Sequence, residues 1–322
     1  MDASAHPAAA AQLRATLIGG IAVLLWSLLA LFTSAAAGIP PFQMLAMTFA
    51  IAFVVSVAVL ARRGRAVLRF DLHAAGEVAA IVADDGRGRA GFALWRRAPA
   101  VSLLGFGGLF GYHFFYFVAL GNAPPVQASL IAFLWPLLIV VFSALLPGER
   151  LRWFHLTGAL IGLAGAVLVV TGGREIAFNA AYAPGYLAAL ACALIWSVYS
   201  VTNRRFGAVP TEVVGGFCGV VAALGLLCHL LLEDTVTPSL GQGLAVFALG
   251  LGPVGLAFFV WDYGTKHGKI QVLGALSYAA PVLSTLALVA FGRAEASWSL
   301  ALACALVTGG AVLASKELLF QR

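Results

Sequence analysis

The chain has 322 residues and a mean hydropathy of +0.99; 62% of its residues are hydrophobic and only 10% are charged. A globular domain is about half apolar and about one quarter charged, so this chain has too few charges to coat a soluble protein of 33.4 kDa. The apolar composition also excludes a disordered chain, and the 36 glycines lack the three-residue period of collagen. The composition therefore predicts a membrane protein with several spans.

Ten apolar stretches are long enough to cross a bilayer as α-helices. A spanning helix needs roughly 20 residues, because the hydrocarbon core is about 30 Å thick and each residue rises about 1.5 Å. Glycine, proline or charged residues interrupt these stretches and favour turns, as at residues 38–41 and 147–150. The predicted spans are residues 14–35, 42–61, 99–120, 124–146, 153–171, 184–203, 212–232, 243–265, 270–292 and 297–316.

The basic residues indicate how the spans are oriented. If the N-terminus is cytoplasmic, all but two of the 19 Lys and Arg residues fall in cytoplasmic segments, the exceptions being Arg174 and Arg293. Cationic loops stay in the cytoplasm, so this asymmetry predicts both termini there, as tails of residues 1–13 and 317–322. The same asymmetry explains the net charge of +6 without a nucleic-acid partner. The long cytoplasmic loop, residues 62–98, is expected to be a solvated linker that touches anionic lipids.

The two halves of the sequence match each other. Trp26 corresponds to Trp196 at an offset of 170 residues, and Pro136 corresponds to Pro281 at an offset of 145. Because the repeated unit has five helices, an odd number, the second unit enters the membrane upside down. Inverted repeats are typical of secondary transporters, whose substrate site lies near the midplane between the repeats. The predicted fold is an all-α membrane protein with ten transmembrane helices in two inverted five-helix repeats, residues 14–171 and 184–316.

Polar aromatic side chains occur deep inside several spans, where lipid offers them no hydrogen-bond partners. Tyrosine and histidine share one sector of the third span, and tryptophans lie well away from the interfaces where membrane proteins usually place them. They either pack within the bundle or line a cavity, and we favour the cavity. Its expected wall comprises Trp26, Tyr112, His113, Tyr116, Trp135, Trp196 and Tyr199.

Two matched prolines, Pro136 and Pro281, interrupt the fourth and ninth spans at equivalent depths. Because proline has no N–H, the carbonyls of Ala132 and Ser277 are expected to lack their intrahelical donors. These carbonyls, with the hydroxyls of Ser277 and Tyr278, are suited to receive an ammonium group. A simple kink is the alternative. The deep parts of the spans hold no Lys or Arg, which favours a small neutral or zwitterionic substrate over a phosphorylated one.

Asp262 is an ionisable residue inside a predicted span, four residues before Lys266. That spacing allows an ion pair on one helix face, and a role in substrate or proton handling is the alternative. The sequence has no HExxH motif and no paired deep carboxylates, so we expect no enzyme, no metal and no cofactor.

Several motifs resemble those of ten-helix drug/metabolite transporters of the EamA type. They are WDYGTKHG at residues 261–268 and ALGN at residues 119–122, each followed by one of the matched prolines, and GER at residues 148–150. Within that superfamily, the stretch FLWP at residues 133–136 is similar to the Tyr-Leu-Trp-Pro stretch of the YddG-type exporters. Here Phe133 replaces the tyrosine, so one hydroxyl is missing.

The resemblance implies a function and a location. It implies an inner-membrane secondary transporter that exports aromatic and other small neutral amino acids by alternating access; a broader exporter of purines or hydrophobic compounds is the alternative. The lipid bilayer and a small-molecule substrate are the expected partners, and a monomer is expected because the fused halves already supply a two-fold assembly. The predicted substrate-binding residues are Trp26, Tyr112, His113, Tyr116, Phe133, Trp135, Pro136, Trp196, Tyr199, Ser277, Tyr278 and Pro281.

Overall fold

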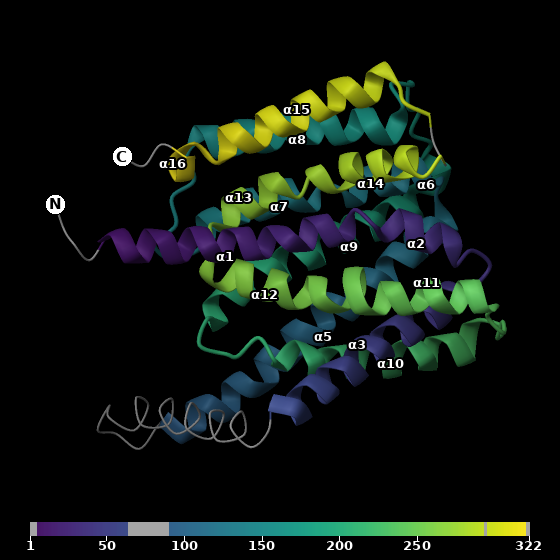
Figure 1. Cartoon of the computed structure of the whole chain (residues 1–322), viewed down its shortest axis with the longest axis horizontal. Helices are drawn as coiled ribbons and strands as arrows, with labels where there is room; N and C mark the ends of the chain where they lie inside the picture. The colour runs from purple at the N-terminus through teal and green to yellow at the C-terminus, as the bar shows by residue number, and fades with distance from the viewer. Residues whose placement is uncertain (1–4, 64–89, 293–294, 320–322) are drawn as a thin grey trace.

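The computed structural model describes residues 5–63, 90–292 and 295–319, and the regular elements in these ranges are all helices. Nine segments of the described chain are long and apolar enough to cross a membrane, and a shorter apolar helix, Trp298–Ala314, follows them. The bundle of long helices is seen in Figure 1. This architecture confirms the predicted all-α membrane fold.

The first half of the chain supplies five crossings. Its helices are α1 (Ala5–Trp26), α2 (Leu29–Ala35), α3 (Pro41–Arg63), α5 (Ala90–Asn122), α6 (Pro125–Ala132), α7 (Trp135–Phe142), η1 (Ser143–Leu145) and α8 (Trp153–Thr171). The pairs α1–α2 and α6–α7 are the halves of the first and fourth spans, separated by two-residue turns. Gly172 ends α8 in the left-handed conformation, with φ of 62°, which glycine adopts without a steric penalty.

The second half repeats this pattern. Its helices are η2 (Ala180–Tyr182), α9 (Ala183–Asn203), η3 (Arg204–Phe206), α10 (Val213–Leu232), α11 (Leu240–Leu251), η4 (Gly252–Leu256), α12 (Ala257–His267), α13 (Ile270–Leu276), α14 (Ala279–Ala290), α15 (Trp298–Ala314) and α16 (Lys316–Leu319). The eighth span contains the π-helical turn η4 between α11 and α12, and the ninth span is divided into α13 and α14. Side-chain oxygens of Ser239 and Ser297 cap the first turns of α11 and α15.

Some helix boundaries differ from the predicted spans. The third spanning helix begins at Ala90, so the predicted loop at residues 62–98 is shorter at that end, and residues 64–89 lie outside the described residues. The first helix begins at Ala5, within the predicted cytoplasmic tail. Hydropathy marks the part of a helix that crosses lipid, and a helix continues beyond the bilayer without any change in that signal.

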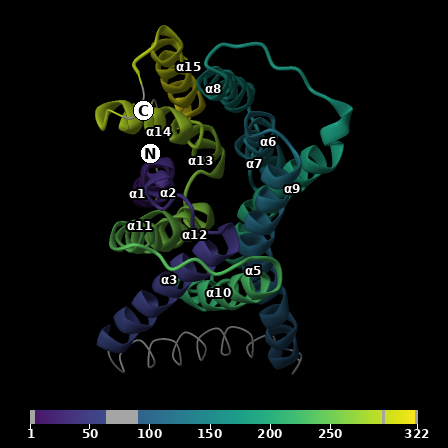
Figure 2. The same cartoon turned by 90° about the vertical axis from the view of Figure 1, so that its right-hand side faces the viewer.

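The packing of the helices follows the internal repeat. Equivalent spans pack against each other in the pairs α3–α10 and α8–α15, and the pairs α5–α9 and α1–α12 are repeat images of one another. Figure 2 shows these helices end-on, with α8 beside α15 and α3 beside α10. The α1–α12 contact is especially close, because a Cβ added to Gly19 would lie 2.8 Å from the Cα of Gly264. Small residues of this kind let membrane helices approach backbone to backbone.

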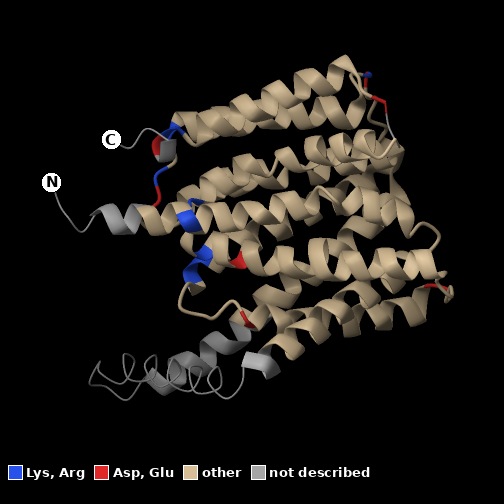
Figure 3. Cartoon of the chain, viewed as in Figure 1, with Lys and Arg blue, Asp and Glu red and all other residues tan. Residues whose placement is uncertain are grey.

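The two ends of the bundle differ in charge. The start of α1 and the short helix α16 lie at one end, which we call the terminal end, and the other is the distal end (Figure 1). In Figure 3 the Lys and Arg residues of the described chain gather at the terminal end, with an exception at the distal end, where Arg174 follows α8. Five crossings separate α1 from α9, so these equivalent helices enter from opposite ends, as inverted repeats require.

Candidate functional site

The matched prolines stand at the starts of half-helices. Pro136 is the second residue of α7, and Pro281 is the third residue of α14. Proline is tolerated in the first turn because an N–H there has no intrahelical acceptor. Pro281 supplies no N–H to the Ser277 carbonyl, as expected, and that carbonyl instead accepts a bond of 3.1 Å from the Ala280 N–H. At Pro281 the chain breaks the helix before the proline and satisfies the freed Ser277 carbonyl locally.

Four tryptophans from four different spans meet at these interruptions. α1 ends at Trp26 and α7 begins at Trp135, and their ring centroids are 6.0 Å apart. Trp196 of α9 lies 5.8 Å from Trp26, and Trp261 of α12 lies 5.0 Å from Trp26 and 5.8 Å from Trp135. We call Trp26, Trp135, Trp196 and Trp261 the tryptophan cluster. It joins two spans of each repeat, which is where an inverted-repeat transporter holds its substrate.

The polar aromatic residues of α5 extend this cluster. Tyr112 lies 5.4 Å from Trp196, and it contacts His113 at 5.2 Å and Tyr116 at 6.1 Å. Tyr199 contacts Trp196 at 5.2 Å from its own helix. The structure therefore brings seven of the predicted site residues into one continuous aromatic region.

Hydrogen bonds orient several groups of the cluster. The Trp26 indole N–H donates to the Pro253 carbonyl in the π-helical turn, 3.1 Å away, and the Trp261 indole N–H donates to Ser200 Oγ at 3.1 Å. The His113 Nδ1 lies 2.7 Å from the Leu109 carbonyl, so this nitrogen carries the proton. In the neutral imidazole the Nε2 is then an acceptor. The site thus combines broad apolar faces with a few fixed polar groups.

The remaining predicted residues lie apart from the tryptophan cluster or bond to the backbone of the half-helices beside it. The Tyr278 hydroxyl accepts the Leu137 N–H at 3.1 Å, in the first turn of α7. The Ser277 hydroxyl donates to the Leu273 carbonyl at 2.8 Å. Tyr278 belongs to a second buried cluster, with residues of α8 and α15, while Phe133 is half-buried at the end of α6. In this conformation the two hydroxyls therefore bond to backbone groups of the protein.

Three aromatic residues of the region were not predicted. Trp261 is fully buried, and Phe258 stacks on Phe49, which also contacts His113. Trp261 stands four residues from the end of its predicted span, where tryptophan is usual at the interface. The helix continues to His267, which places Trp261 deeper than that boundary indicated. No sequence signal separates the two phenylalanines from the other apolar residues of their spans.

The surroundings of the aromatic region carry little charge. The nearest ionic group along the chain is Asp262, which follows Trp261 and pairs with Lys266 at 2.8 Å, so the ion pair predicted from their spacing is confirmed. Among the described residues, no group of three His, Cys, Asp or Glu side chains is placed to hold a metal ion. The arrangement suits contact with an uncharged or zwitterionic solute that carries an apolar part.

A model of the EamA-like transporter family matches residues 13–171 and 183–316. The chain belongs to this family. Membership confirms the predicted resemblance and the architecture of ten helices in two inverted repeats. The EamA-like protein is a multi-pass membrane transporter of a small-molecule substrate and, as predicted, not an enzyme.

Several named proteins are similar to this EamA-like chain. The aromatic amino acid exporter YddG of Ancylobacter novellus is 54% identical over 303 residues, which are 94% of this chain and 96% of the relative. The exporter of the same name from Escherichia coli is 29% identical over 240 residues, covering 69% of this chain and 80% of the relative. A solved crystal structure is similar with a TM-score of 0.83 at 53% sequence identity, covering 95% of this chain and 97% of that chain.

Proposed function

We propose that this chain exports aromatic and other small neutral amino acids by alternating access. The observation that carries the proposal is the tryptophan cluster at the junction of the two repeats. It occurs in a chain that is 54% identical to an aromatic amino acid exporter. A zwitterion has no net charge, so its site needs no fixed counter-charge, and each well-placed aromatic contact adds about 0.5–1.5 kcal/mol beyond the burial of area.

The proposed site comprises the twelve residues expected from the sequence, in two roles. The aromatic region receives the substrate ring, and the His113 Nε2 and the tyrosine hydroxyls are the polar groups beside it. Tyr278, Ser277 and the two prolines shape the half-helices that carry Trp135 and its neighbours. Trp261 joins the site as a residue that the structure adds.

The proposed location is the inner membrane, with both termini in the cytoplasm. Support comes from the Lys and Arg residues at the terminal end, because cationic segments stay on the cytoplasmic side. The terminal end is then the cytoplasmic end and the distal end is the periplasmic one. We also propose that the repeats occupy residues 14–171 and 184–316, and that the chain acts as a monomer, because both halves of the two-fold assembly are present in one chain.

Counterflow in proteoliposomes tests the proposed substrate class. Vesicles loaded with unlabelled phenylalanine are expected to accumulate labelled phenylalanine, and tryptophan and threonine are expected to compete. Counterflow of labelled purines or hydrophobic dyes, in the absence of any amino-acid counterflow, would favour the broader exporter and contradict the proposal.

Substitution in the tryptophan cluster tests the site. Trp135→Ala removes ring contacts to Trp26, Trp196 and Trp261, so we expect phenylalanine counterflow to fall by about tenfold or more. Trp298→Ala is the matched control, because this tryptophan is 91% exposed. Equal counterflow in the Trp135 variant and the control would remove the cluster from the site.

A further inference from the structure

A buried polar network joins α9 to α12 at the terminal end. The Asp262 carboxylate pairs with Lys266 at 2.8 Å and accepts hydrogen bonds from Asn203 at 2.9 Å and Thr211 at 2.6 Å. Asn203 also donates to Thr265 Oγ1, at 3.2 Å. The side chains of Asp262 and Lys266 are each only 1% exposed. A buried ion pair persists only where further hydrogen bonds satisfy both charges, and Asp262 has those bonds.

Backbone carbonyls complete the network. The Lys266 ammonium donates to the Val209 carbonyl at 2.9 Å, and Arg204 donates to the carbonyls of Thr265 and Gly268. The Arg204 guanidinium also pairs with Glu149 at 2.6 Å. We call the set that links the end of α9 to α12 the polar zipper. It comprises Ser200, Asn203, Arg204, Val209, Thr211, Trp261, Asp262, Thr265 and Lys266.

The zipper is continuous with the proposed substrate site. Trp261 precedes Asp262 in the chain, and its indole bonds to Ser200, one turn before Asn203 on α9. Thr265 Oγ1 also donates to the Trp261 carbonyl at 3.0 Å. A separation of α9 from α12 therefore displaces a wall of the tryptophan cluster. Movement at this end and the shape of the site are coupled through adjacent residues.

The internal repeat identifies the position at the distal end that corresponds to the zipper. At the offset of 170 residues Asn203 corresponds to Thr33, and at the offset of 145 Asp262 and Lys266 correspond to Phe117 and Gly121. The image of the α9–α12 contact is thus a contact between α2 and α5, and no ion pair is possible there. Thr33 and Gly121 are both exposed, and no atom lies within 4 Å of a Cβ added to Gly121.

The helix packing has the same asymmetry. α9 packs against α12, whereas α2 packs mainly against α11 and α14, and α5 against α9, α10 and α6. Several other pairings are symmetric, since α3–α10 and α8–α15 map onto themselves and α5–α9 maps onto α1–α12; the packing of α8 against α13 and α14 is a second pairing without a comparable image. Among the described elements, the α9–α12 contact is therefore one that the distal end does not match. In inverted-repeat transporters one bundle moves against another about the fixed site. If the terminal end takes the arrangement of the distal end, and the distal end that of the terminal end, the α9–α12 contact opens.

We propose that the polar zipper is the latch of the cytoplasmic gate and that Asp262 is its central positioning residue. The proposal rests on the proposed function for its direction, since it takes the terminal end as cytoplasmic. Asp262 holds Lys266, Asn203 and Thr211 in place, and it acts on the substrate site through Trp261. The matching positions of the distal counterpart, Thr33, Phe117 and Gly121, offer no ion pair. Polar bonds on one side therefore bias the resting protein towards the outward-open state.

Distances between spin labels at the two ends test this proposal without any substrate. One pair, Ala208→Cys and His267→Cys, spans the zipper, and the other pair, Ala35→Cys and Asn122→Cys, spans its distal image; all four positions are exposed. The four native cysteines are first replaced by alanine or serine. In the parent protein we expect a short distance across the zipper and a long one across the image.

The Asp262→Asn variant is expected to reverse this pattern. The ratio of open to closed zipper should rise by about tenfold, because Lys266 loses its buried partner, and the distal distance should shorten in the same molecules. Thr211→Val removes one donor and keeps the ion pair, so it should fold readily and shift the ratio in the same direction by less. Unchanged distances in the variants, or lengthening at both ends together, would overturn the proposal, because general loosening is not gating.

The outcome remains distinguishable from that of the proposed function. The distance measurement needs no amino acid, so it tests the latch even if counterflow of amino acids is absent. Labelling of His267→Cys by a membrane-impermeant thiol reagent from outside intact cells would place the terminal end outside. That result would refute the proposed orientation and with it the assignment of the latch to the cytoplasmic gate.

Discussion

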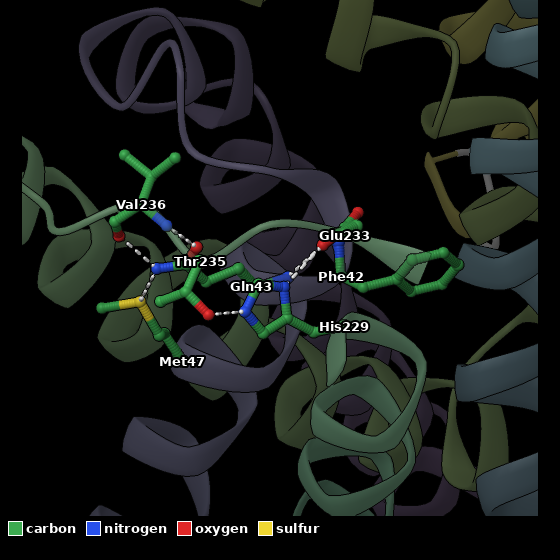
Figure 4. Close-up of polar contacts among 7 residues, drawn as sticks. All are labelled: Phe42, Gln43, Met47, His229, Glu233, Thr235 and Val236. Atoms are coloured by element: carbon green, nitrogen blue, oxygen red, sulfur yellow. Dashed lines mark hydrogen bonds and ion pairs between the residues drawn. The ribbon is translucent and has the colours of Figure 1, made fainter. Parts of the chain in front are cut away.

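The polar zipper at the terminal end contrasts with a second polar assembly at the distal end. There, Glu233 accepts hydrogen bonds from the N–H groups of Phe42 and Gln43, at 2.9 and 3.0 Å, in the first turn of α3. His229 lies 2.9 Å from the same carboxylate, and the Gln43 side chain both donates to and accepts from the Val236 backbone (Figure 4). We call these five residues the distal clamp. It fastens the start of α3 to the end of α10.

The two assemblies join different kinds of helix pair. The clamp joins α3 to α10, a pair that the repeat maps onto itself. This pair is packed along its length, from Gly215 beside Ser56 to Gly225 beside Ala46. The zipper joins α9 to α12, a pair whose image is not packed. Polar bonds on a self-matched pair therefore stabilise both states of an inverted-repeat protein, whereas polar bonds on an unmatched pair select one state.

The largest expected effect is on stability at the zipper. Asp262→Asn should lower the free energy of unfolding by about 3 kcal/mol, because it leaves the Lys266 ammonium buried without its carboxylate. Lys266→Met should cost a similar amount, and the double variant should cost less than the sum. Unfolding in mixed micelles titrated with SDS measures this cycle. Additive costs would show that the two charges are not coupled in the folded protein.

The residues of the zipper show what the sequence alone revealed. The four-residue spacing predicted the pair of Asp262 with Lys266, because residues so spaced are neighbours on a helix. Asn203 and Thr211 come from another helix and a connection, and no local pattern relates them to Asp262. The composition, the internal repeat and the depth of residues in the spans predicted the ten-helix fold and seven residues of the aromatic region. Contacts between residues of different helices could be identified only from the packed structure.

The interrupted helices show the second limit. The matched prolines predicted local disruption in the fourth and ninth spans, and both spans are indeed divided there. The place of each break depends on which tertiary partner receives the freed backbone group. Tyr278 bonds to Leu137 in another span, and a proline pattern holds no information about that partner. Depth likewise identified Trp135 and Trp196, while Trp261 was missed because its helix extends past the apolar stretch.

A smaller effect is expected at the distal clamp. Glu233→Gln should lower the free energy of unfolding by about 1–2 kcal/mol, because an amide cannot accept all three bonds and brings no negative charge to the N-terminus of α3. The spin-label distances across the zipper and its image should stay as in the parent protein. Asp234→Asn, at the exposed neighbouring residue, is the control and should change neither quantity. A shift in the gate distances would show that the clamp also selects a state.

The smallest effect is expected at Tyr278, where the two repeats differ by a single hydroxyl group. The fourth and ninth spans are repeat equivalents and pack through α7 and α13, yet their bond is one-sided: Tyr278 bonds to Leu137, and the image of Tyr278 is Phe133, which has no hydroxyl. Tyr278→Phe should therefore cost about 1 kcal/mol. We expect this bond, unlike those of the distal clamp, to break when the half-helices exchange their packing, so the loss should fall on the present state and the open-to-closed ratio of the zipper should rise about fivefold. Tyr182→Phe, at an exposed tyrosine, is the control. A loss of stability without a shift in the ratio would show that this bond persists in both states.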